Sequence, residues 1–227
     1  MFSRLAWRYD LVNDLMSFGM HRRWKRYAVR LALAGRPRGS ARVLDLCCGS
    51  GDLCFLAEEL GAGPVTGADF TLPMLAVARK RQIASASKSR FVQADALRLP
   101  FPDGAFDVIT ISYGLRNIAD IPAALLEIRR VLAPGARVVV LDFGKPDNPV
   151  AAALYGAYLR TVMPAIGWIF HGDADTYLYI PESLARYPGQ RGVEKLMREA
   201  GLASPRYEER LLGTMGINVA EAPPRIV

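Results

Sequence analysis

A short glycine-rich stretch that contains an acid is the first place in this chain where chemistry is expected. The stretch "RVLDLCCGSGDL", residues 42–53, holds an apolar run with Asp45 in it, followed by Gly49 and Gly51. Glycines at these positions allow the backbone to turn tightly and let a ligand approach it closely. A helix that begins directly after the turn would direct its first N–H groups at that ligand. The stretch therefore predicts a ligand site between a strand and a helix.

Two further aspartates stand at equivalent places along the chain. Asp69 and Asp95 end the next two apolar runs. We expect Asp69 to accept hydrogen bonds from both hydroxyls of a ribose, Asp95 to reach the amino group of an adenine, and Asp45 to face an amino-bearing or cationic group. Each aspartate taken alone is also explained as a helix N-cap. Together with the turn, the three favour S-adenosylmethionine, which carries an amino group, a sulfonium and an adenosine.

The three cysteines of the chain lie close to the same turn, at positions 47, 48 and 54. An odd number of cysteines in one short stretch is a poor disulfide framework. Their spacing, with no histidine nearby, is not that of a zinc site. We interpret them as small buried side chains in a reducing compartment and expect no metal.

The elements that would position these residues alternate along the chain. Helices are expected at 51–60, 72–85, 121–132 and 192–202, and strands at 42–47, 64–69, 90–95, 106–112, 136–143, 206–213 and 214–221. Apolar strands separated by helices indicate a parallel sheet that is covered on both faces. With right-handed crossovers, the predicted fold class is α/β, a doubly wound and mostly parallel seven-stranded sheet.

We expect one domain over residues 1–227, in four parts. These are an N-terminal helical cap (1–41), a cofactor-binding core (42–143), a substrate-side insertion (144–190), and a C-terminal helix with strands (191–227). The insertion is rich in aromatic residues and has prolines at 146, 149, 164, 181 and 188, so it is expected to be irregular. A long insertion of this kind is typical of a lid or binding loop.

The net charge of +7 is concentrated at the N-terminus. Residues 1–40 hold nine Lys or Arg and two Asp, whereas the remaining residues balance. This distribution is not that of a uniformly basic nucleic-acid binder, so no nucleic-acid partner is expected. A helix is predicted there, with the apolar residues Met20, Trp24, Tyr27, Ala28 and Leu31 on one face and the cations Arg22, Arg23, Lys25, Arg26 and Arg30 on the rest. One basic segment on a neutral body predicts a surface that meets something anionic.

The longest motifs resemble one family. "YDLVNDLMSFGMHRRWKR" (9–26) and "ITISYGLRNIAD" (109–120) are similar to two signatures of the UbiE/MenG family of class I S-adenosylmethionine methyltransferases. "LPFPDGAFDVI" (99–109) and "EIRRVLAPGARVVVLDFGKP" (127–146) fit the same family, so the resemblance covers nearly the whole chain. "LDLCCGSGDL" (44–53) and "YLYIPESLARYPG" (177–189) look most like its cyanobacterial and chloroplast branch. The family methylates a ring carbon in ubiquinone, menaquinone and phylloquinone biosynthesis.

The resemblance implies cofactor contacts at Ser50, Asp69, Asp95 with Ala96, and Ser112. Combined with the turn, the predicted S-adenosylmethionine-binding residues are Asp45, Gly49, Ser50, Gly51, Asp69, Phe70, Asp95, Ala96 and Ser112. Cys47 replaces the first glycine of the general methyltransferase motif.

The acceptor implied by the closest branch is 2-phytyl-1,4-naphthoquinol, the reduced form of demethylphylloquinone. Demethylmenaquinone and a 2-polyprenyl-6-methoxy-benzoquinol are the alternatives. We expect Arg116 to stabilise the developing oxyanion, although a surface arginine paired with an acid explains it equally well. Tyr113 and Asn117 are candidates for orienting the ring, and Tyr9, Asp10 and Asn13 for closing over the methyl donor. His171, Asp173 and Asp175 are the candidates for the base.

An isoprenoid tail places the substrate in a membrane, so we expect the basic N-terminal helix to meet a membrane surface. The expected location is the cytoplasmic face of a bacterial or cyanobacterial membrane, or a chloroplast. The candidates for a tail channel are Leu154, Tyr155, Tyr158, Leu159, Met163, Trp168, Ile169 and Phe170.

Three rival functions come from other classes. A dinucleotide-dependent reductase is opposed by the missing Gly-x-Gly-x-x-Gly spacing. A scaffold with an inactive methyltransferase core is opposed by the intact acids at 45, 69 and 95. A nucleic-acid methyltransferase is opposed by the position of the basic residues, away from the strand ends.

Overall fold

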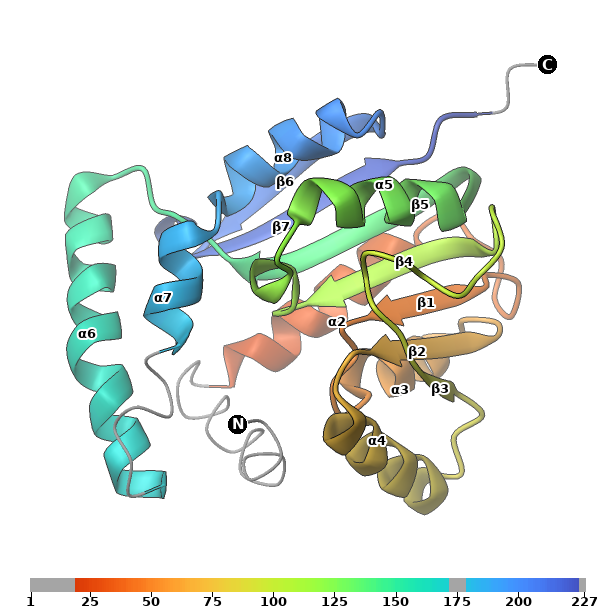
Figure 1. Ribbon diagram of the computed structural model, residues 1–227, viewed down its shortest axis with the longest axis horizontal. Coiled ribbons are helices and arrows are strands. Elements are labelled where there is room, and N and C mark those ends of the chain that lie inside the picture. Colours follow the sequence, from red (N-terminus) through yellow and green to blue (C-terminus); the bar gives the residue numbers. More distant parts are fainter. Residues whose placement is uncertain (1–18, 172–178, 225–227) are drawn as a thin grey trace.

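The computed structural model describes residues 19–171 and 179–224, with side chains for 19–162 and 181–224. In these residues a seven-stranded sheet runs in the order β3-β2-β1-β4-β5-β7-β6 (Figure 1). The strands in chain order are β1 (Val43–Leu46), β2 (Val65–Asp69), β3 (Arg90–Gln93), β4 (Phe106–Ser112), β5 (Leu132–Phe143), β6 (Ala203–Arg210) and β7 (Met215–Glu221). Strands β1 to β5 pair in parallel, and β7 lies antiparallel between β5 and β6. The predicted fold class, including the mostly parallel seven-stranded sheet, is confirmed.

Helices cover both faces of this sheet. The chain forms α2 (Met20–Leu33), α3 (Asp52–Glu59), α4 (Leu72–Ser85), η2 (Leu115–Asn117), α5 (Ile121–Val131), α6 (Pro149–His171), α7 (Tyr179–Arg186), α8 (Gly189–Glu199) and η4 (Leu211–Gly213). Side chains of α2, α3 and α4 share one buried apolar cluster with the sheet, and those of α5 and α8 share the cluster on the other face. Because both faces are covered, β1 is buried along its whole length and β4 along nearly all of its own.

The strand order reverses between β1 and β4. From β1 the chain winds outward through β2 to β3, and it then crosses back to start β4 on the other side of β1. The connections that leave β1 and β4 therefore diverge at their carboxyl ends, which opens a crevice there. Of the three predicted aspartates, Asp45 lies in β1, Asp69 ends β2 and Asp95 follows β3, so all three belong to the β1 side of this point.

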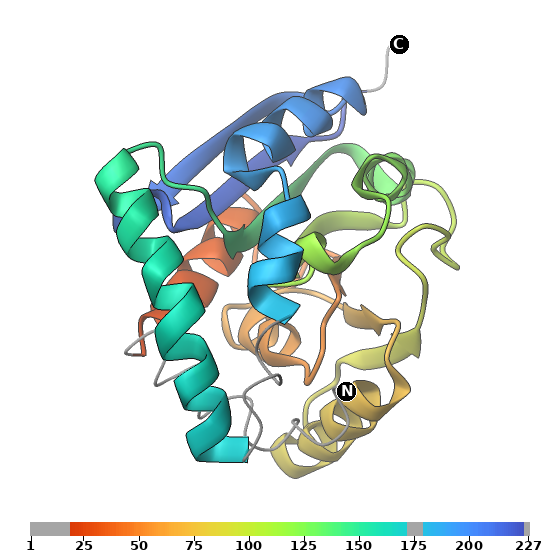
Figure 2. The same cartoon turned by 60° about the vertical axis from the view of Figure 1, so that its left-hand side comes forward.

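Most of the described part of the insertion at 144–190 is helical, not irregular as predicted. Helix α6 runs from Pro149 to His171, and α7 from Tyr179 to Arg186. Three of the prolines that suggested irregularity lie where a helix begins: Pro149 opens α6, Pro181 is in the first turn of α7, and Pro188 precedes α8. A proline in the first turn loses no hydrogen bond, because the N–H groups there have no partner within the helix. Figures 1 and 2 show α7 beside α6, and α7 also packs against η2.

The buried face of α2 also differs from the predicted one. The buried residues are His21, Lys25, Ala28, Val29 and Ala32. Tyr27, predicted on the apolar face, is exposed, and its hydroxyl donates to Glu208 of β6. Lys25, predicted among the exposed cations, is buried. No helix in the described part of the chain is both long enough and apolar enough to cross a bilayer.

Candidate functional site

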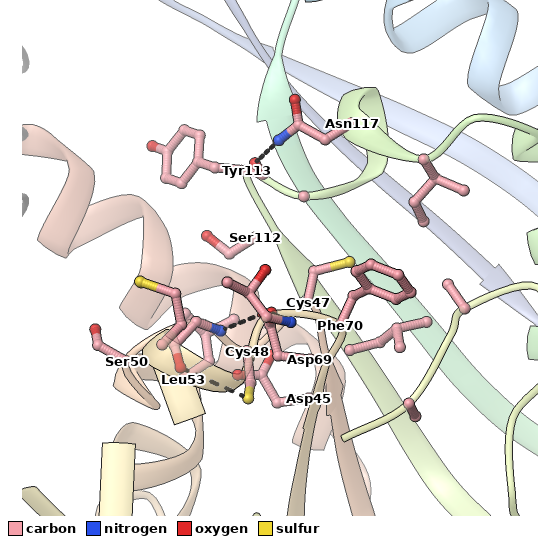
Figure 3. Close-up of a pocket in the computed structure, with 18 of the residues that line it drawn as sticks. Asp45, Cys47, Cys48, Ser50, Leu53, Asp69, Phe70, Ser112, Tyr113 and Asn117 are labelled. Atoms are coloured by element: carbon pink, nitrogen blue, oxygen red, sulfur yellow. Dashed lines mark hydrogen bonds between the residues drawn. The ribbon is translucent and has the colours of Figure 1, made fainter. Parts of the chain in front are cut away.

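A cavity of about 440 Å³ lies at the carboxyl ends of β1, β2 and β4, where the strand order reverses (Figure 3). Its lining comes from α2, the glycine-rich turn, and the segments after β2, β3 and β4. All of the predicted cofactor-binding residues except Gly51 line it, namely Asp45, Gly49, Ser50, Asp69, Phe70, Asp95, Ala96 and Ser112. Lys25, Cys47, Asp52, Met74, Leu97, Tyr113 and Asn117 are also among its walls.

The glycine-rich turn is held mainly by the protein itself. The Asp69 carboxylate accepts from the N–H groups of Gly49 and Thr71, each at 2.8 Å. The Cys48 N–H donates to the Ala68 carbonyl, and the Gly51 N–H to the Cys48 carbonyl. These three N–H groups of the turn are thus used within the protein, whereas the expectation that the first N–H groups of the following helix face a ligand stays a prediction. Asp69 fixes the turn, and its oxygens can accept further bonds from a ribose because a carboxylate has about four lone-pair sites.

Gly51 turns the chain without touching the cavity. Its φ of +87° is in the left-handed region, and a Cβ there would lie 2.9 Å from the Phe91 ring. A side chain at this position would be strained and would also collide with β3.

Cys47 is the residue that replaces a glycine of the general motif, and a second glycine compensates for it. Its φ of +57° lies in the left-handed region that favours glycine. The side chain occupies space left by Gly114, where an added Cβ would lie only 2.3 Å from the Cys47 Cβ. The turn after β1 and the loop after β4 are thus in close contact at this point.

Asp45 is buried under the turn. Its carboxylate accepts from the Thr110 hydroxyl at 2.8 Å and from the Cys54 thiol at 3.6 Å. Burial raises its pKa to about 7, against the lowering effect of these two bonds and of the nearby Lys25 charge. A cationic ligand group in the cavity would shift Asp45 to its charged form, so the site is suited to an ammonium.

The three thiols are free and act as packing and hydrogen-bonding groups. Burial raises the pKa of Cys47, and a hydrogen bond with Cys48 together with burial raises that of Cys54. Thiols with a raised pKa stay protonated at neutral pH, which removes their nucleophilic character.

The end of β4 presents a hydroxyl to the cavity. The Ser112 Oγ is buried and has no hydrogen-bond partner among the described residues. Because an unpaired buried hydroxyl costs free energy, its position indicates a bond to a ligand. Asp95, also in the lining, accepts from the Leu97 N–H at 2.9 Å, and the lining residue Phe70 is 70% exposed.

Three charged side chains meet at the first turn of α3. Asp52 accepts from the Lys25 ammonium at 2.7 Å and from the Arg81 guanidinium at 2.6 Å. Arg81 also donates to the hydroxyl and the carbonyl of Ser50. Although burial acts to raise the pKa of Asp52, the two cations and their hydrogen bonds lower it to about 2. Asp52 is therefore ionised at neutral pH.

Arg116 is placed differently from the other predicted residues. Its side chain is 2% exposed and does not line the cavity. The guanidinium donates to Asp142 of β5 at 2.7 Å and to the Tyr113 carbonyl at 2.6 Å, and it lies over the Phe143 ring. The alternative of an arginine paired with an acid describes this geometry, with the difference that the pair is buried. The catalytic role of Arg116 stays a prediction, whereas Tyr113 and Asn117 do line the cavity.

Several predicted residues lie outside the described residues or side chains. Tyr9, Asp10, Asn13, Asp173 and Asp175 belong to segments that the structure does not describe, and His171 is described only by its backbone, as the last residue of α6. Their predicted roles stay predictions.

Sequence reasoning missed Lys25, Asp52 and Asp142. A signal for Lys25 was present, because it is separated from Ala28, Val29 and Ala32 by three, four and seven positions, the spacing of one helical face. Asp52 and Asp142 had no such signal, since each depends on partners that are distant in the sequence.

The similarity of this chain to known proteins extends over nearly its whole length. A model of the ubiE/COQ5 methyltransferase family matches residues 1–221. The chain belongs to this family. It is 46% identical to a demethylmenaquinone methyltransferase of Thermus thermophilus, over 98% of this chain and 100% of the relative. It is 44% identical to a 2-phytyl-1,4-naphtoquinone methyltransferase of Synechococcus elongatus, over 98% of this chain and 95% of the relative.

The fold is shared with solved structures of much lower identity. A SAM-dependent methyltransferase from Aquifex aeolicus superposes with a TM-score of 0.59 at 17% identity, covering 82% of this chain and 84% of that one. This ubiE/COQ5 family member is an S-adenosylmethionine-dependent C-methyltransferase. The residues of its cavity fit that methyl donor, because the wall carries the carboxylates of Asp45, Asp69 and Asp95 and a Ser112 hydroxyl that has no hydrogen-bond partner among the described residues. The role of each of these residues toward the donor stays a prediction. The described residues hold no group of three or more His, Cys, Asp or Glu arranged for a metal ion.

Proposed function

We propose that this chain methylates a ring carbon of a 2-prenylated 1,4-naphthoquinol, with S-adenosylmethionine as the donor. The family is one of quinone C-methylation, as the names of its relatives say. The demethylmenaquinone and phytyl-naphthoquinone relatives are similarly close, so the phytyl tail expected from the sequence stays a prediction. A benzoquinol of the ubiquinone pathway is the second candidate, because the family name includes ubiE.

The observation that supports a long apolar tail is a second cavity, of about 390 Å³, between α6 and α7. Most of its lining is apolar, and Lys145 and Arg160 are its cations. Tyr155 and Leu159, two of the predicted tail-channel residues, are in its wall. Of the other candidates, Leu154 is 68% exposed on α6 and Tyr158 packs against the apolar core, and neither lines this cavity. Met163, Trp168, Ile169 and Phe170 lie outside the described side chains.

The Arg116–Asp142 pair is next to both cavities. The first cavity is lined by Tyr113 and Gly114, which precede η2, and by Asn117, the last residue of η2. The second cavity is lined by Gly144 and Tyr155. The pKa of Tyr155 is raised by burial and is also influenced by the charges of Arg116 and Asp142. One substrate could therefore occupy both cavities, with its quinol ring near Tyr113 in the first and its prenyl tail between α6 and α7 in the second.

In the proposed mechanism, residues of the cavity bind the methyl donor and a base activates the acceptor. When bound, S-adenosylmethionine supplies a methyl group on a sulfonium, which needs no further activation. Asp45, Asp69, Asp95 and Ser112 hold that donor in the cavity and so orient its methyl group. A quinol carbon becomes nucleophilic when the adjacent hydroxyl loses its proton, so a base must face the ring. His171, Asp173 and Asp175 remain the proposed candidates for it.

Arg116 acts in this proposal first as a positioning residue. Its bonds to Asp142 and to the Tyr113 carbonyl fix the loop that carries Tyr113 and Asn117 into the cavity. Its positive charge close to that loop also favours an oxyanion on the ring, as expected from the sequence.

The enzyme would work at a bilayer surface, at the cytoplasmic face of a bacterial membrane or in a chloroplast. Arg22, Arg23 and Arg30 are exposed on α2, and Val150, Leu154 and Val162 are exposed on α6. These two groups are the proposed contacts with anionic lipid and with the acyl region.

Incubation with methyl-labelled donor and reduced substrates tests the proposed function. Phytyl-naphthoquinol, polyprenyl-naphthoquinol and a polyprenyl-benzoquinol are compared at equal concentration in detergent. We expect both naphthoquinols to be methylated faster than the benzoquinol. A preference for the benzoquinol would support the second candidate, and no transfer to any of the three would contradict the proposal.

A further inference from the structure

The amino-acid end of the methyl donor carries an ammonium and a carboxylate on the same carbon atom. The acids of the cavity wall account for the ammonium, but a carboxylate needs a cation or N–H donors. Lys25 is the one Lys or Arg in the described lining of the cavity. We propose that Lys25 binds the carboxylate of S-adenosylmethionine and makes the site specific for a donor that retains it. This inference rests on the use of that donor and not on the identity of the quinol ring.

Three backbone N–H groups of the glycine-rich turn, which could otherwise bind an anion, already have partners. The N–H groups of Cys48, Gly49 and Gly51 donate to protein oxygens. Asp52 stands in the first turn of α3, so its own negative charge occupies the end of the helix that would attract an anion. A positive side chain on the cavity wall would therefore supply an interaction that these three N–H groups cannot give to a donor carboxylate.

The charge balance around Asp52 leaves that positive charge available. Asp52 binds two cations, Lys25 through Oδ2 and Arg81 through Oδ1. One carboxylate between two cations gives a net positive cluster, and of the two cations only Lys25 lines the cavity. An ammonium has three N–H donors, of which the bond to Asp52 takes one. Because Lys25 is only 8% exposed, further acceptors must come from within the site.

Asp45 supplies the matching negative charge. The Lys25 charge is one of the influences on the Asp45 carboxyl, so the two groups lie within electrostatic reach of each other. Both line the same cavity. An acid and a cation on the walls of one cavity are complementary to an amino acid, which carries an ammonium and a carboxylate.

Titration calorimetry with three ligands isolates the carboxylate. These are S-adenosylmethionine, decarboxylated S-adenosylmethionine, and 5′-methylthioadenosine, which lacks the amino-acid end. The proteins are wild type, Lys25→Met, Lys25→Arg and Arg26→Met. Arg26 is a matched control, because it also joins α2 to α3, through Glu59 at 2.7 Å, but does not line the cavity. Circular dichroism checks that each variant is folded.

Because Lys25→Met removes the charge-assisted hydrogen bond to the donor carboxylate, we expect it to weaken binding of the intact donor by about tenfold to a hundredfold. Binding of the decarboxylated donor and of methylthioadenosine should change by less than about threefold, since neither carries the carboxylate. Lys25→Arg should keep the preference for the intact donor, and Arg26→Met should leave all three affinities unchanged.

An equal loss for all three ligands in Lys25→Met would overturn the proposal, because it would make Lys25 a structural contact between α2 and α3. Unchanged binding of the intact donor would overturn it as well. If Lys25→Met does not fold, the wild type alone decides, because equal affinity for the intact and decarboxylated donors excludes a carboxylate site. Failure of the quinol proposal would leave these affinities unaffected.

Discussion

At the scale of single residues, the free energy of binding and the free energy of folding oppose each other at Asp45. Its buried carboxyl has a pKa raised to about 7, so the folded protein binds a proton there more readily than the unfolded chain. Stability is therefore greatest below the unfolded pKa and falls as the pH rises toward about 7. The charged form, which costs stability, is the form that an ammonium ligand requires.

Asp45→Asn should remove this pH dependence. We expect its melting temperature to fall less than that of the wild type between about pH 5 and pH 8, with each kcal/mol worth about 2–4 °C. Its affinity for S-adenosylmethionine at the upper end of that range should fall, because the amide carries no charge. Differential scanning fluorimetry and calorimetry measure the two effects. Asp107 is the control, because hydrogen bonds with Arg42 lower its pKa and keep it ionised over this whole range, so Asp107→Asn should leave the pH dependence between about pH 5 and pH 8 unchanged. If the melting temperature of Asp45→Asn depended on pH as that of the wild type does, Asp45 would not be the source of the pH dependence.

Arg116→Ala has two expected effects that must be separated. Removing it leaves the buried Asp142 without its cation, which costs about 3–5 kcal/mol of stability. Turnover should be largely lost, while S-adenosylmethionine binding at low temperature survives. The double variant Arg116→Ala/Asp142→Ala should recover part of the stability but not the turnover. Melting temperature, calorimetry and initial rates give the three readouts, and turnover that recovers together with stability would remove Arg116 from the chemistry.

At the scale of elements, the contact between the turn after β1 and the loop after β4 joins two halves of the site. Gly114→Ala should destabilise the protein and weaken donor binding, because its Cβ would lie 2.3 Å from that of Cys47. Cys47→Gly removes the obstacle and also suits the left-handed φ at that position. The double variant should therefore be more stable than Gly114→Ala alone. Thermal unfolding of the four proteins measures this coupling, and simple additivity would contradict it.

These two loops show which features of the fold and of the site could be predicted from the sequence. The apolar runs, the turn glycines and Asp45, Asp69 and Asp95 are local signals, and they led to the correct sheet and to residues that do line one cavity. The Cys47–Gly114 contact and the Lys25–Asp52–Arg81 cluster join residues far apart in the chain, so no local pattern contains them. The helical insertion was missed for a different reason, because a proline count does not distinguish the first turn of a helix from its interior.

At the scale of the whole molecule, the two proposed membrane contacts differ in chemistry. The exposed arginines of α2 would contribute about 1 kcal/mol each near anionic lipid. The exposed side chains of α6 would contribute apolar burial, which does not depend on lipid charge. Lys25 takes no part, because it is buried at the cavity. The first contact should therefore weaken with salt, and the second should not.

Vesicle flotation separates the two contacts. Wild type should float with vesicles containing anionic lipid more than with neutral ones, and Arg23→Glu/Arg30→Glu should reduce flotation on the anionic vesicles only. Val150→Asp/Leu154→Asp should reduce it on both, since those side chains are 66% and 68% exposed. Ile83→Asp is the matched control, because Ile83 is 82% exposed on α4 and is not among the proposed contacts. If Ile83→Asp lowered flotation as much as the α6 variant, general surface polarity would explain the result and the α6 contact would be excluded.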